Sequence, residues 1–301
     1  MRVLCINPGM HHKNINFLLK CKKIDFSFIN KVEDMYNFDL TTFDAVISPC
    51  LPLDVSKFPN TKFIFGPQFS VFPDNSLDII KGPKTAYNQL SEWVVNAWKS
   101  FPICDNLNLV SLPFGVDTEK FMSTKNIRER NKVLVYFKTR NPSDLCLVEN
   151  FLQEKNVEFK VFSYNSGYNE DEYLNYLQNS KFCIWIDAHE SQGFALQEAL
   201  SCDVPLLVWN VKSMNQAHGY NYLDIPATST SYWHEKCGEV FYNINDLEAS
   251  YSKFIDCLET YKPREFILEN LSIEACETRF IEYIEQRVFY TDEHLKWDKP
   301  L

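Results

Sequence analysis

Two glutamates eight positions apart, Glu190 and Glu198, have the spacing in this chain that most directly suggests chemistry. Glu190 stands in a short polar break, and Glu198 stands roughly two turns, on the order of 9–12 Å, into a helical pattern. Carboxylates accept hydrogen bonds from vicinal hydroxyls, and a helix start between them presents free N–H groups to an anion. The pair therefore suits a ligand with sugars at both ends and phosphate between them. The alternative is that both are solvated glutamates of a loop and a helix face.

The elements around the two glutamates follow the pattern strand, loop, helix, strand. Residues 182–187 (FCIWID) and 205–209 (PLLVW) are short apolar runs, which predict buried strands of a parallel sheet. Between them, Ser191 offers an N-cap and Gly193 leaves the first turn of the helix open. The helix would thus start at the carboxyl end of a strand, where open α/β sheets bind ligands.

Two cations follow another predicted strand, residues 132–137. Lys138 and Arg140 precede a helix that we expect to be capped by Ser143, and together they form a candidate clamp for phosphate. Two solvated loop cations are an equally good interpretation. Gly167, in the polar turn YNSGYNED, would let the backbone approach a ligand.

The first predicted strand, residues 2–6, is followed by a polar break that carries Gly9, His11 and His12. Histidines at the carboxyl end of a strand are candidates for a ligand contact or a general base. A pair of surface loop histidines is the favoured alternative.

The chain divides into two apolar-rich halves at the polar segment STKNIRERNK. Short apolar runs alternate with helical stretches in both halves, which predicts an α/β fold with two Rossmann-like, parallel-sheet domains. A helix over residues 84–100 is expected late in the first half, and another over 263–285 closes the second. The predicted boundaries give a first domain, a second domain and a tail that docks back on the first: 1–118, 119–280 and 281–301.

Composition narrows the class of protein. Hydrophobic residues make up 45% of the 301 residues, which suits a folded chain, and the net charge of −10 argues against a nucleic-acid surface. The ten cysteines include no C-x-x-C pair, and no apolar stretch is long enough to span a membrane. We therefore expect a cytoplasmic protein with reduced thiols, and weak association with a membrane surface stays an open alternative. No cluster has metal-ligand spacing, so no metal is expected.

Three segments resemble a known family. The segment ESQGFALQEALSCDVPLLV is similar to the E-x7-E motif of retaining GT-B glycosyltransferases, of the group 1 or family-four-like type. The upstream segments LPFGVDTEKF and QLSEWVVNAW look like that family's hinge-side segment and the helix before it. The motif positions in register are Glu190, Gly193, Glu198, Ala199 and Pro205. The fold this implies is GT-B, with two domains facing a central cleft and the C-terminal helix packing on the first.

The resemblance also implies roles for individual residues. Glu190 would contact the donor sugar, and Glu198 the ribose hydroxyls of a nucleotide-sugar donor. Lys138, with Arg140 as a substitute partner, would grip the diphosphate in place of the family's arginine and lysine. The expected donor-side residues also include Ser191, Gly193, Phe194, Ala195 and Gly167; the acceptor-side candidates are Gly9, His11 and His12.

The activity implied is transfer of a hexosyl or pentosyl group to a glycan, lipid or protein-linked acceptor, with retention of configuration and without metal or other cofactor. The family's glycine-rich loop after the first strand is reduced here to Asn7-Pro8-Gly9. That departure keeps a second hypothesis open, a GT-B relic that binds a nucleotide or glycan without turnover. A related epimerase or phosphorylase is a third.

Overall fold

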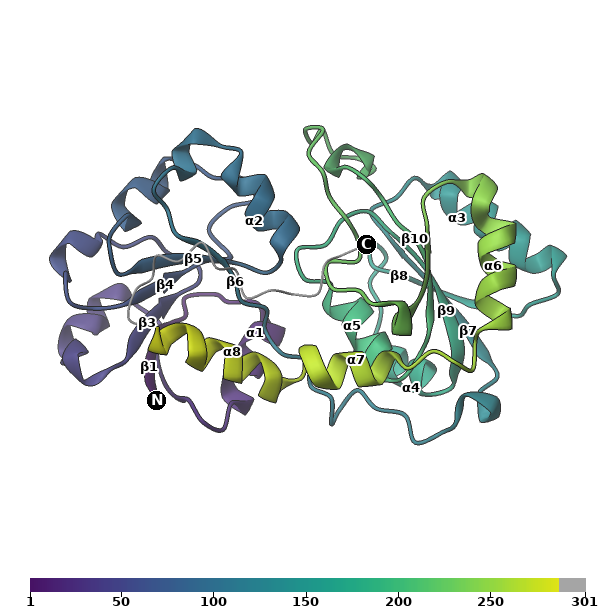
Figure 1. Cartoon of the computed structure of the whole chain (residues 1–301), viewed down its shortest axis with the longest axis horizontal. Coiled ribbons are helices and arrows are strands. Elements are labelled where there is room, and N and C mark those ends of the chain that lie inside the picture. Colours follow the sequence, from purple (N-terminus) through teal and green to yellow (C-terminus); the bar gives the residue numbers. More distant parts are fainter. Residues whose placement is uncertain (287–301) are drawn as a thin grey trace. The chain divides into compact units, whose positions relative to one another are not determined.

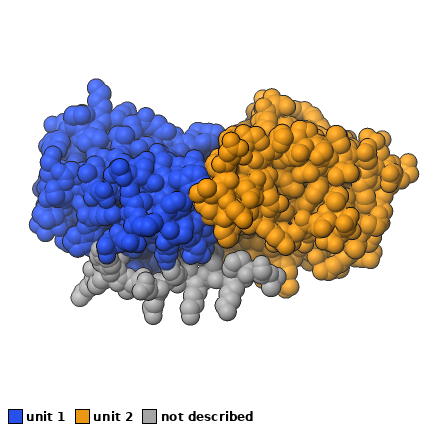
Figure 2. All heavy atoms as spheres, turned by 90° about the horizontal axis from the view of Figure 1, so that it is seen from above, with its two compact units in different colours: residues 1–115, 271–301 blue, residues 116–270 orange. Residues whose placement is uncertain are grey.

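The computed structural model describes residues 1–286, which form two compact α/β units (Figure 1). Unit 1 contains residues 1–115 and the chain from 271 onward, and unit 2 contains residues 116–270 (Figure 2). The predicted fold class, two α/β domains with parallel sheets, is confirmed. The divisions fall three residues before the predicted first boundary and ten before the predicted second. Residues 287–301, most of the predicted docking tail, lie outside the described residues.

Unit 1 is built on a six-stranded parallel sheet in the order β2-β1-β3-β4-β5-β6. Its strands are β1 (Arg2–Ile6), β2 (Asp25–Ile29), β3 (Ala45–Ser48), β4 (Phe63–Phe65), β5 (Thr85–Gln89) and β6 (Leu109–Ser111). Its α-helices are α1 (His12–Lys20), α2 (Glu92–Lys99) and α8 (Ile273–Glu285). Buried side chains cover both faces of the sheet, as parallel sheets require.

Helix α8 belongs to unit 1 although it is far from the rest of that unit in sequence. Its Phe280 ring packs 5.6 Å from that of Phe17 in α1. Oε1 of the buried Glu277 accepts hydrogen bonds from the backbone N–H groups of Lys23 and Ile24, the latter at 3.0 Å. The Cβ of any residue replacing Gly115 would lie 2.5 Å from Cα of Ile273, so the close approach of the two segments requires glycine. The C-terminal helix is therefore part of the first unit's core.

Unit 2 contains a five-stranded parallel sheet in the order β11-β10-β9-β7-β8. Its strands are β7 (Lys132–Lys138), β8 (Lys160–Ser163), β9 (Ser180–Asp187), β10 (Leu206–Trp209) and β11 (Gly238–Phe241). Its helices are α3 (Pro142–Glu154), α4 (Glu170–Gln178), α5 (Phe194–Ser201), α6 (Leu247–Asp256) and α7 (Pro263–Asn270).

The two faces of this sheet are packed differently. Alternate residues of β7 and β9, such as Val135 and Ile184, join α3 and α6 in a hydrophobic core of aliphatic and aromatic side chains. On the opposite face, Tyr136 and Trp185 stack with ring centroids 3.9 Å apart, and Tyr173 of α4 packs beside them. Lys138 and Asp187 continue the second series, because both lie two residues beyond the stacked rings on the same face.

Four local predictions differ from the structure. Residues 84–100 are not one helix: the five buried residues of β5 pair with β4 and β6, and α2 begins only at Glu92. Residues 263–285 form two helices, because Ser272 starts a new one by accepting a hydrogen bond from Ala275 N–H at 3.2 Å. The helix after β7 is capped by Asn141 and not by Ser143, and α5 is preceded by Gly193 and not by Ser191. Within residues 1–286, no helix is both long and apolar enough to cross a membrane.

Candidate functional site

The candidate site lies in unit 2, at the carboxyl ends of the central strands β7 and β9. Lys138 is the last residue of β7, Asp187 is the last of β9, and the two are direct partners in the parallel register. The loop that follows β9 carries Glu190 and leads into α5. Charged side chains from two neighbouring strand ends therefore meet at the edge where α/β sheets bind ligands.

Lys138 and Glu190 form an ion pair at this edge. Their side chains are 20% and 18% exposed, so the pair is mostly withdrawn from water. The Lys138 ammonium also lies 4.3 Å from the ring centroid of Tyr164, which follows β8. Burial acts to lower the pKa of Lys138, but the charges of Glu190 and Asp187 outweigh it and raise that pKa. The lysine is thus a firmly protonated cation in contact with a carboxylate.

Asp187 completes the cluster, and the sequence prediction missed it. Asp187 is 1% exposed, and its Oδ1 accepts a hydrogen bond from Ala188 N–H at 2.7 Å. Oδ2 is buried, and no N–H or hydroxyl group of residues 1–286 donates to it. Burial raises the pKa of Asp187 well above its ordinary value, Glu190 raises it further, and Lys138 acts against both. A signal was present, since Asp187 ends an otherwise apolar run, FCIWID.

The backbone around Glu190 is fixed by the segment after β10. Glu190 N–H donates to the carbonyl of Thr228 at 3.1 Å, and the hydroxyl of Ser231 donates to the carbonyl of Glu190. The buried Asn210 orders that segment, because its amide donates to Thr228 and its Oδ1 accepts from the backbone N–H of Ser229. The Glu190 side chain therefore projects from a backbone that is held on both sides of its peptide.

Helix α5 begins immediately after this loop. Gly193, at its N-cap, has φ +80°, a left-handed conformation that favours glycine. Phe194 and Ala195 form the half-buried first turn, and the exposed Ser191 lies in the loop. This turn follows Glu190 by three to five residues, so the start of α5 lies next to the strand end that carries Asp187.

Glu198 lies in a different environment from Glu190. It is 3% exposed, and its charge contributes to raising the pKa of the buried Tyr173 phenol, after burial and the neighbouring Tyr168 and Cys183. The Tyr173 hydroxyl donates to the carbonyl of Ala195 at 2.9 Å, so α4 and α5 pack closely here. The structure thus groups Glu190 with Lys138 and Asp187, and places Glu198 against α4.

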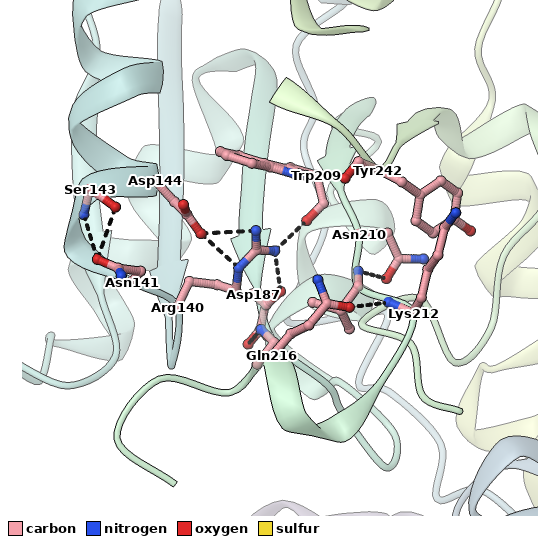
Figure 3. A network of polar contacts seen from close by, with 12 residues as sticks. Arg140, Asn141, Ser143, Asp144, Asp187, Trp209, Asn210, Lys212, Gln216 and Tyr242 are labelled. Atoms are coloured by element: carbon pink, nitrogen blue, oxygen red, sulfur yellow. Dashed lines mark hydrogen bonds and ion pairs between the residues drawn. The ribbon is translucent and has the colours of Figure 1, made fainter. Parts of the chain in front are cut away.

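Arg140 does not join Lys138 in a clamp. Its guanidinium is buried and reaches Asp144 at 2.9 Å, as well as the carbonyls of Asp187 and Trp209 at 3.3 and 3.1 Å (Figure 3). It also stacks on the Trp209 ring, 4.8 Å from the centroid. Burial lowers the pKa of Arg140, although Asp144 offsets part of this effect. Its donors are used to tie the ends of β9 and β10 together, which leaves Lys138 as the cation beside Glu190.

Two loops extend the same edge of unit 2. Gly167 has φ +71°, and its N–H donates to the carbonyl of Tyr164 at 3.0 Å, so its turn holds the ring that lies over Lys138. The loop after β10 is attached by a hydrogen bond from His218 N–H to the carbonyl of Thr139, at 2.9 Å. The same loop places Tyr222 against His189, with ring centroids 5.2 Å apart.

The acceptor-side candidates lie at the corresponding edge of unit 1. His11 caps α1, its Nδ1 accepting a hydrogen bond from Lys13 N–H at 3.4 Å. The His11 and His12 rings are 4.4 Å apart, and both residues are exposed, as is Gly9. Among residues 1–286, no group of three or more His, Cys, Asp or Glu could hold a metal ion.

Comparisons with known proteins identify no family for the chain. No protein-family model and no curated protein matches the sequence. Among solved structures, the chain is similar to the catalytic domain of starch synthase IV from Arabidopsis thaliana bound to ADP and acarbose, with a TM-score of 0.44 and 9% identity. The similarity covers 83% of this chain and 69% of that one.

Proposed function

We propose that the chain is a glycosyltransferase of the GT-B type that takes its sugar from a nucleotide-sugar donor. The observation that carries this proposal is the Lys138–Glu190 ion pair at the carboxyl ends of β7 and β9, immediately before the start of α5. This end of the sheet thereby combines a cation that can bind phosphate, a carboxylate that can bind hydroxyls, and a helix start that can bind either.

The roles proposed for these groups follow from their chemistry. Lys138 would leave Glu190 to bind the diphosphate and stabilise its charge as it departs. Glu190 would then accept hydrogen bonds from the donor sugar, and the first turn of α5 would support the diphosphate or a sugar hydroxyl. Arg140 would act as a positioning residue, because its hydrogen bonds hold the strand end that carries Asp187. Transfer would proceed with retention, by same-face displacement, and without a metal.

Two further assignments complete the proposal. Glu198 would bind the ribose hydroxyls, which requires the ligand to reach a carboxylate that is enclosed in the structure described here. Gly9, His11 and His12, at the sheet edge of unit 1, would contact the acceptor. The acceptor would be a glycan or another hydroxyl-bearing molecule, and the protein would act in the cytoplasm.

The test is a screen of UDP-, GDP-, ADP- and TDP-sugars by thermal shift, because a ligand that binds the folded state raises its melting temperature. Replacing Glu198 with alanine should weaken binding of the best ligand by about 1–3 kcal/mol, the loss expected for charge-assisted hydrogen bonds. Calorimetry of wild type and variant measures this difference. If the affinities are equal, Glu198 is not a ligand contact; if no nucleotide sugar binds the wild type, the proposed function is wrong.

A second candidate function is a nucleotide- or glycan-binding protein without turnover. Two observations favour it: the short Asn7-Pro8-Gly9 segment after β1, and the burial of Arg140, which removes one cation from the expected clamp. Incubation with the best-binding nucleotide sugar, labelled in the sugar, distinguishes the two functions. Labelled product on any acceptor would exclude the binding protein.

A further inference from the structure

The cluster at the end of β9 contains one carboxyl group more than its cation can balance. Lys138 faces both Asp187, its register partner, and Glu190, its ion-pair partner. The carboxyl groups of Glu190 and Asp187 lie close enough for Glu190 to raise the pKa of Asp187, and the buried Oδ2 of Asp187 receives no hydrogen bond within residues 1–286. Since neither carboxylate has a hydrogen to donate, a hydrogen bond between them would require a proton on one of them.

We propose that Asp187 is a positioning residue for Glu190: when an anionic ligand draws Lys138 away, Asp187 takes up a proton, keeps it, and donates a hydrogen bond to Glu190 in place of the lysine. The ligand class is a phosphate ester, and this inference therefore rests on the proposed function. The proton comes from solvent, and no bond other than O–H is made. Glu190 thus stays ionised and held in place, able to accept hydrogen bonds from sugar hydroxyls.

The surroundings of Asp187 favour the proton there. The charged and titratable groups that face it are Lys138 and Tyr136 of β7, Arg140 of the following loop, and Glu190 of its own loop. Arg140 is bonded to the Asp187 carbonyl and not to its carboxyl group. The charges of Lys138 and Arg140 both oppose protonation of Asp187, but Arg140 is paired with Asp144, and Lys138 is the cation paired with Glu190.

His189 is not a substitute source of charge. Burial lowers its pKa, and Lys138 lowers it further, against the effect of Glu190. The imidazole is therefore neutral at neutral pH and offers no second cation to the carboxyl pair. Departure of Lys138 would raise the pKa of Asp187, and binding would be accompanied by proton uptake.

The experiment is calorimetry of the full chain with the nucleotide sugar that binds best in the thermal-shift screen. Its diphosphate is esterified at both ends, so it lacks the terminal phosphate ionisation near pH of about 6. The binding heat is measured in two buffers of different ionisation heat, between about pH 6 and about pH 9, which counts the protons taken up. In wild type we expect uptake approaching one proton, with affinity falling up to about tenfold per pH unit on the alkaline side.

Two variants separate the proposed role from a merely structural one. In Asp187→Asn the amide supplies the donor permanently, so binding should persist, with no proton uptake attributable to the site and a flat pH profile. Asp171→Asn makes the same chemical change at an exposed residue of α4, and it should keep the wild-type profile.

The outcomes are distinct. Binding to wild type without proton uptake across the pH range overturns the inference and leaves the proposed function standing; the wild-type measurement gives this result even if Asp187→Asn does not fold. Equal uptake in wild type and Asp187→Asn also overturns the inference. Absence of binding by every nucleotide sugar overturns both proposals.

Discussion

Replacing Lys138 with methionine tests the charge balance of the site in the folded protein itself. The change removes the cation but keeps a long side chain, so Glu190 and Asp187 are left facing each other. Removing one partner of a buried ion pair costs about 3–5 kcal/mol. Because the side chains of this pair keep 20% and 18% of their exposure, water relieves part of that cost. We expect a loss of about 2 kcal/mol in the free energy of unfolding at pH of about 8.

The loss should depend on pH, and the sign follows from the carboxyl groups. Without the lysine, the folded protein binds a proton on the Asp187–Glu190 pair more tightly than the unfolded chain does, since unfolded Asp and Glu have pKa values near about 4. Stability is therefore regained as the pH falls toward about 5 and lost as it rises. In wild type, the raised pKa of Lys138 keeps the lysine charged at every pH below about 10.

Urea unfolding of wild type and Lys138→Met at pH of about 5 and about 8 measures the stability lost in the variant. This loss should be smaller by about 1 kcal/mol at the lower pH. Lys160→Met is the matched control, because Lys160 forms an ion pair with Glu172 that is open to solvent. The Lys160 side chain is 42% exposed and that of Glu172 is 55% exposed. It should change stability by no more than about 0.5 kcal/mol at either pH. A Lys138→Met loss that is equally small, or independent of pH, would refute the charge balance described for the site.

Two further substitutions test the positioning of α5. Gly193→Ala places a side chain at φ +80° and 3.5 Å from Cβ of Glu190, so we expect a loss of about 1 kcal/mol in stability and weaker nucleotide-sugar binding, measured by urea unfolding and calorimetry; wild-type affinity would show that the turn need not be kept. Arg264→Ala removes donors to the carbonyls of Ser201 and Phe121, at 2.6 and 3.1 Å. It should lower the free energy of unfolding by about 2–3 kcal/mol, measured by urea unfolding. An unchanged unfolding midpoint would mean that water replaces these hydrogen bonds.

The sequence predicted the sheets better than the elements between them. Strands such as 132–138 and 180–187 are buried on both faces, so nearly every residue must be apolar and the run is visible without any partner. The strand β5 (TAYNQ) was not predicted because its buried residues are largely polar or aromatic. One of them, Asn88, exchanges hydrogen bonds with the backbone of Leu112. Pairing with distant strands decides that such a segment is extended, and local spacing does not contain that information.

The candidate site was predictable as residues but not as contacts. Glu190 and Lys138 each follow a strand in sequence, which nominated them separately, while their ion pair depends on β7 and β9 being neighbours in the sheet. Arg140, like Lys138, is a cation that follows the predicted strand 132–137 in the sequence, so the sequence did not distinguish the two. The backbone between them turns through Thr139, at φ +52°, and Arg140 is directed to Trp209 and Asp144 instead of Glu190. Two residues of separation thus decide which cation lies beside Glu190 and which ties the ends of β9 and β10 together.

Glu190 and Glu198, the two glutamates of the E-x7-E segment, consequently differ in what a ligand must do to reach them. Glu190 is paired with Lys138 at the end of the sheet, where a phosphate would compete with it for the lysine. Glu198 is enclosed in α5, whose C-terminal end is fixed by Arg264 and whose first turn is bonded to Tyr173. If a ligand binds at Glu190, it would exchange charges with the ion pair, whereas a ligand at Glu198 would require movement of packed helices. If both contact one donor, the substitution at Glu190 should act chiefly on affinity, and that at Glu198 on affinity and on the stability of α5 together.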